Sequence, residues 1–226
     1  MTDFQKDTLE RLSYVDKYNK WIVSKFESFL KGSILELGAG LGNITFEILA
    51  RGHKILPTDI DRHFLNSLRK INPKACYLNI QDVNPKTYGR FETIIVINVI
   101  EHIKDDNIAF RNIYKLLKKG GVLVVLVPAH KNLFGSYDRL AKHCRRYTKS
   151  ELESKLKREG FKTLSISYHN KLGAVGWFFN AVVFKKKEFP KSQLFIINFV
   201  VPLLDFIDNL IPFDFGLSIV CVVKKP

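Results

Sequence analysis

Three glycines at alternate positions, Gly38, Gly40 and Gly42, follow the short apolar segment Ile34–Leu37. Glycine permits a tight turn and lets the backbone approach a ligand closely, because it carries no Cβ. Asp59 closes the next apolar segment, and a carboxylate at about that separation is typical of a side chain that binds a ribose. This combination predicts a nucleotide-type cofactor bound on an open α/β sheet.

A second set of reactive side chains lies further along the chain. His102, His130 and His143 stand at predicted strand ends or in the basic loop that follows them. Imidazole is the usual group that exchanges a proton near neutral pH. The run Arg145–Tyr147 offers guanidinium groups that match a carboxylate or phosphate, although a solvated loop is an equal alternative.

The elements that must position these groups alternate between apolar strands and amphipathic helices. Such alternation is typical of a parallel sheet covered on both faces. The predicted strands are Ile34–Leu37, Lys54–Thr58, Ala75–Asn79, Phe91–Ile97, Val122–Val127, Phe161–Tyr168 and Leu217–Val223. The predicted helices are one or two within Thr8–Leu30, then Ile44–Arg51, Arg62–Lys70, Asn107–Lys118 and Lys149–Arg158, the last with a capping box of Thr148 and Glu151. A loop is expected between Asp82 and Arg90. The pair Gly120-Gly121 is expected to end the predicted helix Asn107–Lys118.

About fifty residues separate the last two predicted strands, which is long for a connection within one domain. They contain two apolar segments, Leu172–Phe184 and Leu194–Leu204, on either side of Lys185–Lys187. Neither segment reaches the roughly 20 residues that a membrane-spanning helix needs. We expect inserted, partly buried helices that act as a lid over an apolar pocket, rest on a membrane interface, or complete the core or a dimer contact.

Composition sets further bounds. A chain of 226 residues that is 46% hydrophobic can bury one large core, which predicts a single domain. The three cysteines show no metal-type pairing and the N-terminus has no secretory pattern, so we expect a cytoplasmic protein with reduced thiols. The formal charge of +14 is compatible with an anionic substrate, a membrane surface or nucleic acid, or with a solvated basic surface.

Five segments together resemble the motifs of the class I S-adenosylmethionine (SAM) methyltransferases, over roughly residues 32–168. Glu36 with the three glycines is similar to motif I of that family. The others are Pro57–Asp61, Asn79–Val83, Ile97–Ile103 and Leu117–Leu123. The resemblance implies a seven-stranded Rossmann-like sheet with helices on both faces, an antiparallel last strand and here a helical insertion before it. It divides residues 1–226 into an N-terminal helical lid (1–31), a SAM-binding core (32–168), the insertion (169–216) and the last strand (217–226).

The same resemblance implies which residues hold SAM. Asp59 would accept from both ribose hydroxyls, Asp82 from the adenine amino group, and Val83 would offer its backbone amide. The full expected set is Tyr18, Trp21, Glu36, Gly38, Ala39, Gly40, Asn43, Asp59, Ile60, Asp82, Val83 and Asn98.

Methyl transfer to an oxygen or nitrogen atom of a small acceptor is the expected reaction, with anionic and lipid-like molecules as candidates. The catalytic candidates are His102, His143 and Tyr147, and the substrate-binding candidates are Arg145, Arg146 and His130. The pair Glu101-His102 resembles one that helps to hold a metal in some quinone-pathway O-methyltransferases, but we expect no metal here. An RNA-directed methyltransferase and a non-catalytic methyltransferase-like domain are the alternatives, although Asn98-Val99-Ile100 lacks the Pro-Pro-aromatic run of amino-methyltransferases that act on bases. Nucleic acid is therefore an improbable partner, peripheral membrane contact is a candidate, and a monomer or homodimer is expected.

Overall fold

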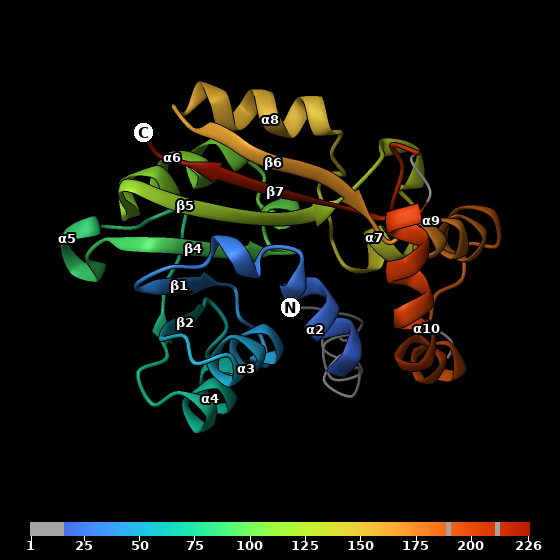
Figure 1. Ribbon diagram of the computed structural model, residues 1–226, viewed down its shortest axis with the longest axis horizontal. Coiled ribbons are helices and arrows are strands. Elements are labelled where there is room, and N and C mark those ends of the chain that lie inside the picture. The colour runs from blue at the N-terminus through green and yellow to red at the C-terminus, as the bar shows by residue number, and fades with distance from the viewer. Residues whose placement is uncertain (1–15, 189–190, 211–212) are drawn as a thin grey trace.

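The computed structural model describes residues 16–188, 191–210 and 213–226. Its centre is a seven-stranded sheet in the order β3-β2-β1-β4-β5-β7-β6 (Figure 1). The strands are β1 Ile34–Leu37, β2 Ile55–Asp59, β3 Cys76–Tyr77, β4 Phe91–Ile97, β5 Leu117–Pro128, β6 Lys162–His169 and β7 Ser218–Lys224. All neighbouring strands are parallel except that β7 runs antiparallel to both β5 and β6. The predicted fold class is confirmed.

Helices surround this sheet and continue beyond one edge of it. The α-helices are α2 Asp16–Ser24, α3 Asn43–Ala50, α4 Arg62–Ile71, α5 Pro85–Tyr88, α6 Asp106–Leu116, α7 Ser136–Leu140, α8 Lys149–Arg158, α9 Lys171–Trp177 and α10 Lys191–Leu210. Short 3₁₀ helices are η1 Glu27–Phe29, η2 Ile100–His102 and η3 Lys131–Leu133, and η4 Phe178–Val183 is π-helical.

Two apolar clusters cover the two faces of the sheet. Alternate residues of a strand point to opposite faces, so Leu123 and Val125 of β5 join one cluster with α6 and α8, whereas Val124 and Leu126 join the other with α2 and α3. The central strands are accordingly apolar at nearly every position. This burial on both faces holds the strand ends rigidly in place for the site at the carboxyl edge.

Side chains at helix starts define several boundaries as local sequence predicts. The Thr148 hydroxyl accepts a hydrogen bond from the Glu151 backbone amide, and α8 has the predicted bounds. Asp61 and Asp105 cap α4 and α6 in the same way. These caps orient the two helices that follow β2 and β4 at the carboxyl edge.

Three local predictions need correction. Helix α5 occupies part of the expected loop between Asp82 and Arg90, because Asn84 caps it and a proline fits the first helical position. The pair Gly120-Gly121 does not end α6, which stops at Leu116; both glycines lie within β5, where they pair with Lys225. The expected basic loop 130–146 contains η3 and α7.

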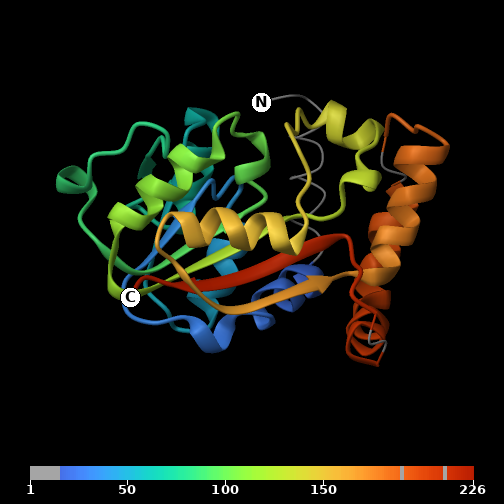
Figure 2. The same cartoon turned by 90° about the horizontal axis from the view of Figure 1, so that it is seen from above.

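The insertion between β6 and β7 is helical, as predicted. Strands β5 and β6 run toward the side where α7, α9 and α10 lie, and β7 runs back (Figure 1). Helices α9 and α10 stand together at that end (Figure 2). The Asp208 carboxylate on α10 accepts from the backbone amides of Asn170 and Lys171, which ties the two helices together. The predicted helical region Thr8–Leu30 is described only from Asp16 on, where it contains α2 and η1.

Candidate functional site

The glycine turn leaves β1 in a conformation that suits glycine alone. Gly38, Gly40 and Gly42 all have positive φ, at 70°, 57° and 87°. A Cβ on Gly38 would lie 2.4 Å from a methyl carbon of Val99, so the space as well as the dihedral angle requires glycine. The turn then opens α3 with Asn43 as its first residue. The turn therefore has the conformation that the spacing of the glycines indicated, and its contact with the cofactor stays a prediction.

Asp59 connects this turn to the end of β2. One carboxylate oxygen accepts from the Gly40 amide and the other from the Asp61 amide, both at 2.8 Å. Burial raises the pKa of Asp59, and these two amides oppose that shift because they favour the charged form. Both oxygens retain lone pairs for further donors, so the side chain can hold the loop and still receive hydroxyl groups.

Glu36 lies beneath the turn. Its side chain is buried and accepts from the Thr45 hydroxyl at 2.5 Å, which joins β1 to α3. Burial raises the pKa of Glu36 to about 7 and the neighbouring Asp59 charge adds to the shift. The carboxyl group of Glu36 beneath the turn therefore has a pKa close to neutral pH.

The segment after β3 completes the predicted cofactor edge. Asp82 is exposed there and Val83 is half-buried. The Asn112 side-chain amide on α6 donates to the carbonyl of Ile80 at 2.8 Å and fixes the course of this segment. Sequence reasoning missed Asn112, for which a polar side chain on the buried face of α6 was the available signal.

Two further residues at this edge have the exposure that a ligand contact needs. Ile60 follows β2 and is 63% exposed, which is unusual for isoleucine beside a sheet. Asn98 follows β4 with a φ of 52°, a left-handed conformation that asparagine tolerates better than most residues. Its backbone amide donates to the Leu126 carbonyl of the neighbouring strand. Both residues fit the predicted site by position.

The structure gives Trp21 a different role from the predicted cofactor lid. Its indole is buried against Val201 and Leu204 of α10, and Nε1 donates to an Asp205 carboxylate oxygen at 2.8 Å. The Tyr18 ring packs beside it, with centroids 5.6 Å apart. Both aromatic residues therefore join α2 to the insertion, a contact that no local pattern in the sequence could predict.

The basic loop is organised around Asp138. One oxygen of its buried carboxylate lies 2.7 Å from His143 Nδ1 and 2.9 Å from Arg146 Nε. These two partners outweigh burial and lower the pKa of Asp138, so the carboxylate is charged and His143 Nδ1 must be the donor. Nε2 of His143 then faces the other way, toward Glu101 at 4.0 Å.

This geometry corrects the prediction that Arg146 binds substrate. The guanidinium is buried, donates to Asp138 and to the Ala129 carbonyl, and lies 4.6 Å from the centre of the Trp177 ring. Two donor atoms and one face of the group are thus occupied within the protein. The prediction failed because the sequence pattern does not reveal that α7 brings an acid beside this position.

Glu101, His102 and His143 form a cluster at the end of β4, with ligand-type atoms all within 4.8 Å of one another. Glu101 is fully buried, and among the described residues neither of its carboxylate oxygens has a hydrogen-bond partner. Burial raises the pKa of Glu101 to about 7. Burial and the neighbouring His143 lower the pKa of His102 to about 4. His102 is consequently neutral at neutral pH and a weak base.

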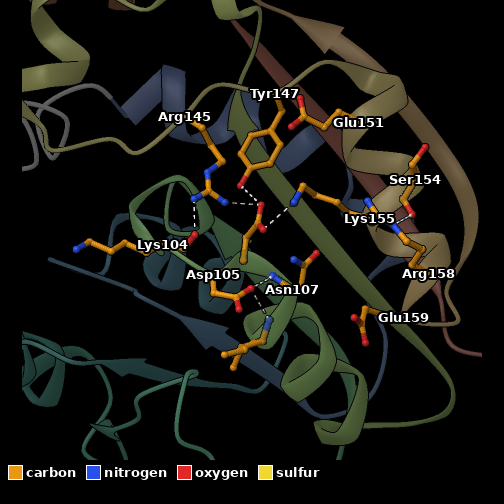
Figure 3. Close-up of polar contacts among 12 residues, drawn as sticks. Lys104, Asp105, Asn107, Arg145, Tyr147, Glu151, Ser154, Lys155, Arg158 and Glu159 are labelled. Carbon is orange, nitrogen blue, oxygen red and sulfur yellow. Dashed lines mark hydrogen bonds and ion pairs between the residues drawn. The ribbon is translucent and has the colours of Figure 1, made fainter.

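The side chains of Arg145, Tyr147 and Lys155 point toward one another (Figure 3), and the Asp106 carboxylate binds all three. This buried carboxylate accepts from the Tyr147 hydroxyl at 2.8 Å and pairs with Arg145 at 2.9 Å and Lys155 at 2.8 Å. Tyr147 is fully buried and its pKa is raised, chiefly by burial. The prediction that Tyr147 is catalytic is therefore wrong, since its hydroxyl is held inside the core. Arg145 keeps a partly exposed face, although Asp106 and the Lys104 carbonyl bind its guanidinium.

His130 lies at a cavity of about 370 Å³ between the segment after β5 and the insertion. Its ring is stacked between Tyr168 and Phe215, with centroids 4.4 Å and 4.7 Å away. Burial lowers the pKa of His130, and its buried Nε2 has no hydrogen-bond partner among the described residues. The remaining lining residues are mostly apolar: Asn132, Leu133, Ala174, Val175 and Phe178.

Trp177 links this cavity to the histidine cluster, and sequence reasoning missed it. Its Nε1 donates to the Leu133 carbonyl at 3.0 Å, and its ring lies against Arg146. Arg146 in turn pairs with Asp138, which holds His143. A second cavity, of about 410 Å³, is lined in part by Arg145, Arg146 and Lys155. The predicted acceptor residues are thus divided between two cavities.

Comparisons with known proteins agree with this geometry. Residues 6–166 match the family described as a methyltransferase domain. Among curated proteins, "Putative methyltransferase YqeM" of Bacillus subtilis is 25% identical over 117 residues, 48% of this chain and 47% of that protein. "Probable polyketide synthase 42" of Dictyostelium discoideum is 29% identical over 130 residues, 45% of this chain but 5% of that protein. The chain therefore matches only half or less of the length of these relatives.

Solved structures share the fold across the insertion as well. A SAM-dependent methyltransferase of Thermotoga maritima superimposes with a TM-score of 0.66 at 13% identity, over 98% of this chain and 95% of that one. A glycopeptide N-methyltransferase in complex with SAM gives a TM-score of 0.60 at 12% identity, over 92% and 94%. The glycine turn, the Asp59 carboxylate and the exposed Ile60 and Asn98 side chains fit such a cofactor. The chain belongs to the methyltransferase-domain family, and its cofactor is S-adenosylmethionine.

Proposed function

We propose that this methyltransferase modifies an oxygen or nitrogen atom of a largely apolar, amphipathic acceptor bound in the His130 cavity. The observation that carries the proposal is the cavity itself, about 370 Å³ and lined mainly by apolar side chains. That volume is in the range of small-molecule sites, in which a few polar groups orient an otherwise apolar ligand.

The position of the cavity supports an acceptor rather than a cofactor role. His130 follows the carboxyl end of β5, and Tyr168 is near the carboxyl end of β6. Asp59 and Asn98 stand at the same edge of the sheet, at the ends of β2 and β4. Ligands of open α/β sheets bind at this edge, so cofactor and acceptor would lie side by side along it.

His130 is a polar residue of the cavity lining, and its buried Nε2 has no hydrogen-bond partner among the described residues. A neutral imidazole nitrogen can donate or accept a single hydrogen bond, and the lowered pKa of His130 keeps it neutral. A hydroxyl or amine of the acceptor that reached Nε2 would form a hydrogen bond there, which a purely apolar ligand could not do. This contact favours an amphipathic acceptor over a hydrocarbon.

His143 is the residue best arranged to take the acceptor proton. Asp138 fixes its tautomer with Nδ1 protonated, so the lone pair is on Nε2. His143 does not line the His130 cavity, so the reacting atom of the acceptor would have to extend from the cavity toward the histidine cluster. There SAM, when bound, would supply the methyl group and the acceptor would lose its proton to Nε2 of His143. His102 is less suited, since a pKa of about 4 makes it a weak base. His143 therefore replaces His102 and Tyr147 as the principal candidate.

Transfer of labelled methyl from SAM to a panel of acceptors tests the proposal. The panel should contain amphipathic phenols and long-chain amines beside water-soluble analogues with the same reacting group. Val175→Trp, which fills the cavity, should abolish transfer to the amphipathic members but leave SAM binding intact. Leu164→Trp, at an exposed site on β6, is the matched control. Transfer that prefers the soluble analogues and is indifferent to Val175→Trp would overturn the proposal.

A further inference from the structure

The helices of the insertion carry their large apolar side chains on the outside. In α9 and η4 the exposed residues Leu172, Val175, Phe179 and Val183 are spaced three or four apart, which places them along one side of the helix. The fully buried residues are small, Ala174 and Ala181, and Trp177 is the large side chain that packs against the protein. A helix that packs on a soluble core shows the opposite arrangement.

Helix α10 repeats this inversion. Phe199, Leu203, Phe206 and Leu210 recur at helical spacing and all are more than half exposed. On the side of α10 that faces the protein, Val201 and Leu204 are buried. On the same side, Asp205 accepts from Trp21 and Asp208 accepts from the Asn170 amide. Outside the insertion, the large exposed apolar side chains of the described residues are far apart in the sequence: Phe46, Ile60, Tyr77, Ile108 and Leu164.

A cationic segment adjoins the two apolar stripes. Lys185, Lys186 and Lys187 follow the 65%-exposed Phe184, and all three are exposed. Lysines next to exposed aromatic and aliphatic side chains are typical of helices that lie in a bilayer interface and meet anionic lipid. None of the helices in the described part of the chain is long and apolar enough to cross a bilayer.

We infer that the outer face of α9, η4 and α10 docks on an anionic lipid bilayer. Charge favours this occupant over a second copy of the chain: anionic lipid neutralises Lys185–Lys187 and the net charge of +14, whereas a second copy has the same positive charge. The apolar side chains would enter the boundary between headgroups and acyl chains. The insertion is then a membrane-binding surface.

This surface is continuous with the acceptor cavity, and here the inference rests on the proposed function. Val175 and Phe178 are exposed on the insertion and also line the cavity. A docked molecule would open its cavity toward the lipid, so that an amphipathic acceptor could enter from the bilayer with its polar end toward His130. The acceptor class that follows is a lipid or lipid-linked molecule with a methylatable oxygen or nitrogen.

Sedimentation with sucrose-loaded vesicles tests the docking. Wild type should bind vesicles of phosphatidylcholine with phosphatidylglycerol, and bind vesicles of phosphatidylcholine alone more weakly. Phe199→Ser with Phe206→Ser should weaken binding about tenfold or more, because two aromatic side chains no longer enter the lipid. Phe46→Ser is the matched control, since Phe46 on α3 is as exposed as Phe206 but lies outside the insertion. Replacing Lys185–Lys187 by glutamine should remove the preference for anionic lipid.

Two results would overturn the inference. One is failure of wild type to sediment with the anionic vesicles. The other is a dimer by gel filtration that the double serine variant converts to a monomer, without any effect on vesicle binding, because the stripes would then be a contact between copies. SAM binding and methyl transfer to a short-chain soluble acceptor should also be measured without vesicles. If both persist while vesicle binding fails, the docking inference is wrong and the proposed methyl transfer is not affected.

Discussion

The His143 ring donates a hydrogen bond from Nδ1 to a carboxylate oxygen of Asp138 at 2.7 Å, inside the loop that joins β5 to α8. The same oxygen accepts from the buried Arg146, so the acid is fixed before it orients the imidazole. A histidine held in this way presents a single tautomer to whatever lies beyond Nε2. Under the proposed function, this arrangement suits a general base.

Replacing His143 tests this role. His143→Gln should lower the methyl-transfer rate about a hundredfold or more, the usual contribution of a positioned base. SAM affinity, measured by isothermal titration, should stay unchanged. His63→Gln on α4 is the control, and an equal loss in both variants would contradict a specific role for His143.

Asp59 should control cofactor affinity. Asp59→Ala removes the acceptor of the Gly40 and Asp61 amides, and with it the expected partner of the ribose hydroxyls. Hydrogen bonds to a charged group contribute about 1.5–3 kcal/mol each, so SAM and S-adenosylhomocysteine should bind at least about tenfold more weakly. Titration calorimetry measures this directly, with the exposed Asp16→Ala as control. Wild-type affinity in Asp59→Ala would place the ribose elsewhere.

Arg146 should matter for stability. Arg146→Ala leaves the buried Asp138 charge without its cation, a change that costs about 3–5 kcal/mol in comparable pairs. Arg145→Ala should cost much less, since Lys155 and Tyr147 still bind Asp106. Urea unfolding followed by fluorescence measures both. A stable Arg146→Ala protein with impaired acceptor affinity would instead restore the substrate role expected from the sequence.

Glu101 should make the free energy of unfolding depend on pH. Burial raises its folded pKa to about 7, above the unfolded value of about 4.5, so the folded state binds more protons between those values. Its contribution is fully present below the unfolded pKa and is lost as pH rises through the folded one. Wild type should therefore lose stability relative to Glu101→Gln between about pH 5 and pH 8, by on the order of 3 kcal/mol. Parallel pH profiles of the two proteins would contradict this.

Removal of divalent metal should leave the enzyme active. The atoms of Glu101, His102 and His143 lie up to 4.8 Å apart, whereas ligands about 2.0–2.1 Å from a tetrahedral zinc stand only about 3.4 Å apart. Methyl transfer after dialysis against EDTA should equal that before it. A loss that added metal restores would show that the cluster contracts around a cation, and the prediction of no metal would be wrong.

Sequence pattern predicted the sheet and the cofactor edge because both depend on local chemistry. Apolar runs give strands that are buried on both faces, and positive φ confines the turn at Gly38 to glycine. The roles of Arg146 and Tyr147 could not be predicted in this way. Each is decided by an acid from another element, Asp138 or Asp106, and only the folded chain brings these side chains together. Isolated guanidinium and phenol groups look the same in sequence whether they face solvent or a buried partner.

The role of Trp21 could not be predicted for the same reason, whereas the error at Asn84 was of a different kind. Trp21 meets Asp205 only because α2 and α10 pack together. The helix α5, by contrast, had a local signal in Asn84 followed by Pro85, a cap and a favoured first residue, which we interpreted as a loop. The inverted helices of the insertion were visible as apolar runs, but which side of each faces solvent depends on the contacts of α9 and α10 with the rest of the fold.

Strand β7 pairs on one side with β5 and on the other with β6, and the apolar insertion precedes it in the chain. During synthesis the ribosome releases β5, β6 and both inserted helices before residues 218–224 emerge. Until then β5 keeps an unpaired edge, β6 has no strand partner, and the sheet is incomplete. A nascent chain can therefore meet a lipid surface while its active site is still unformed, and the enzyme would mature where its acceptor resides.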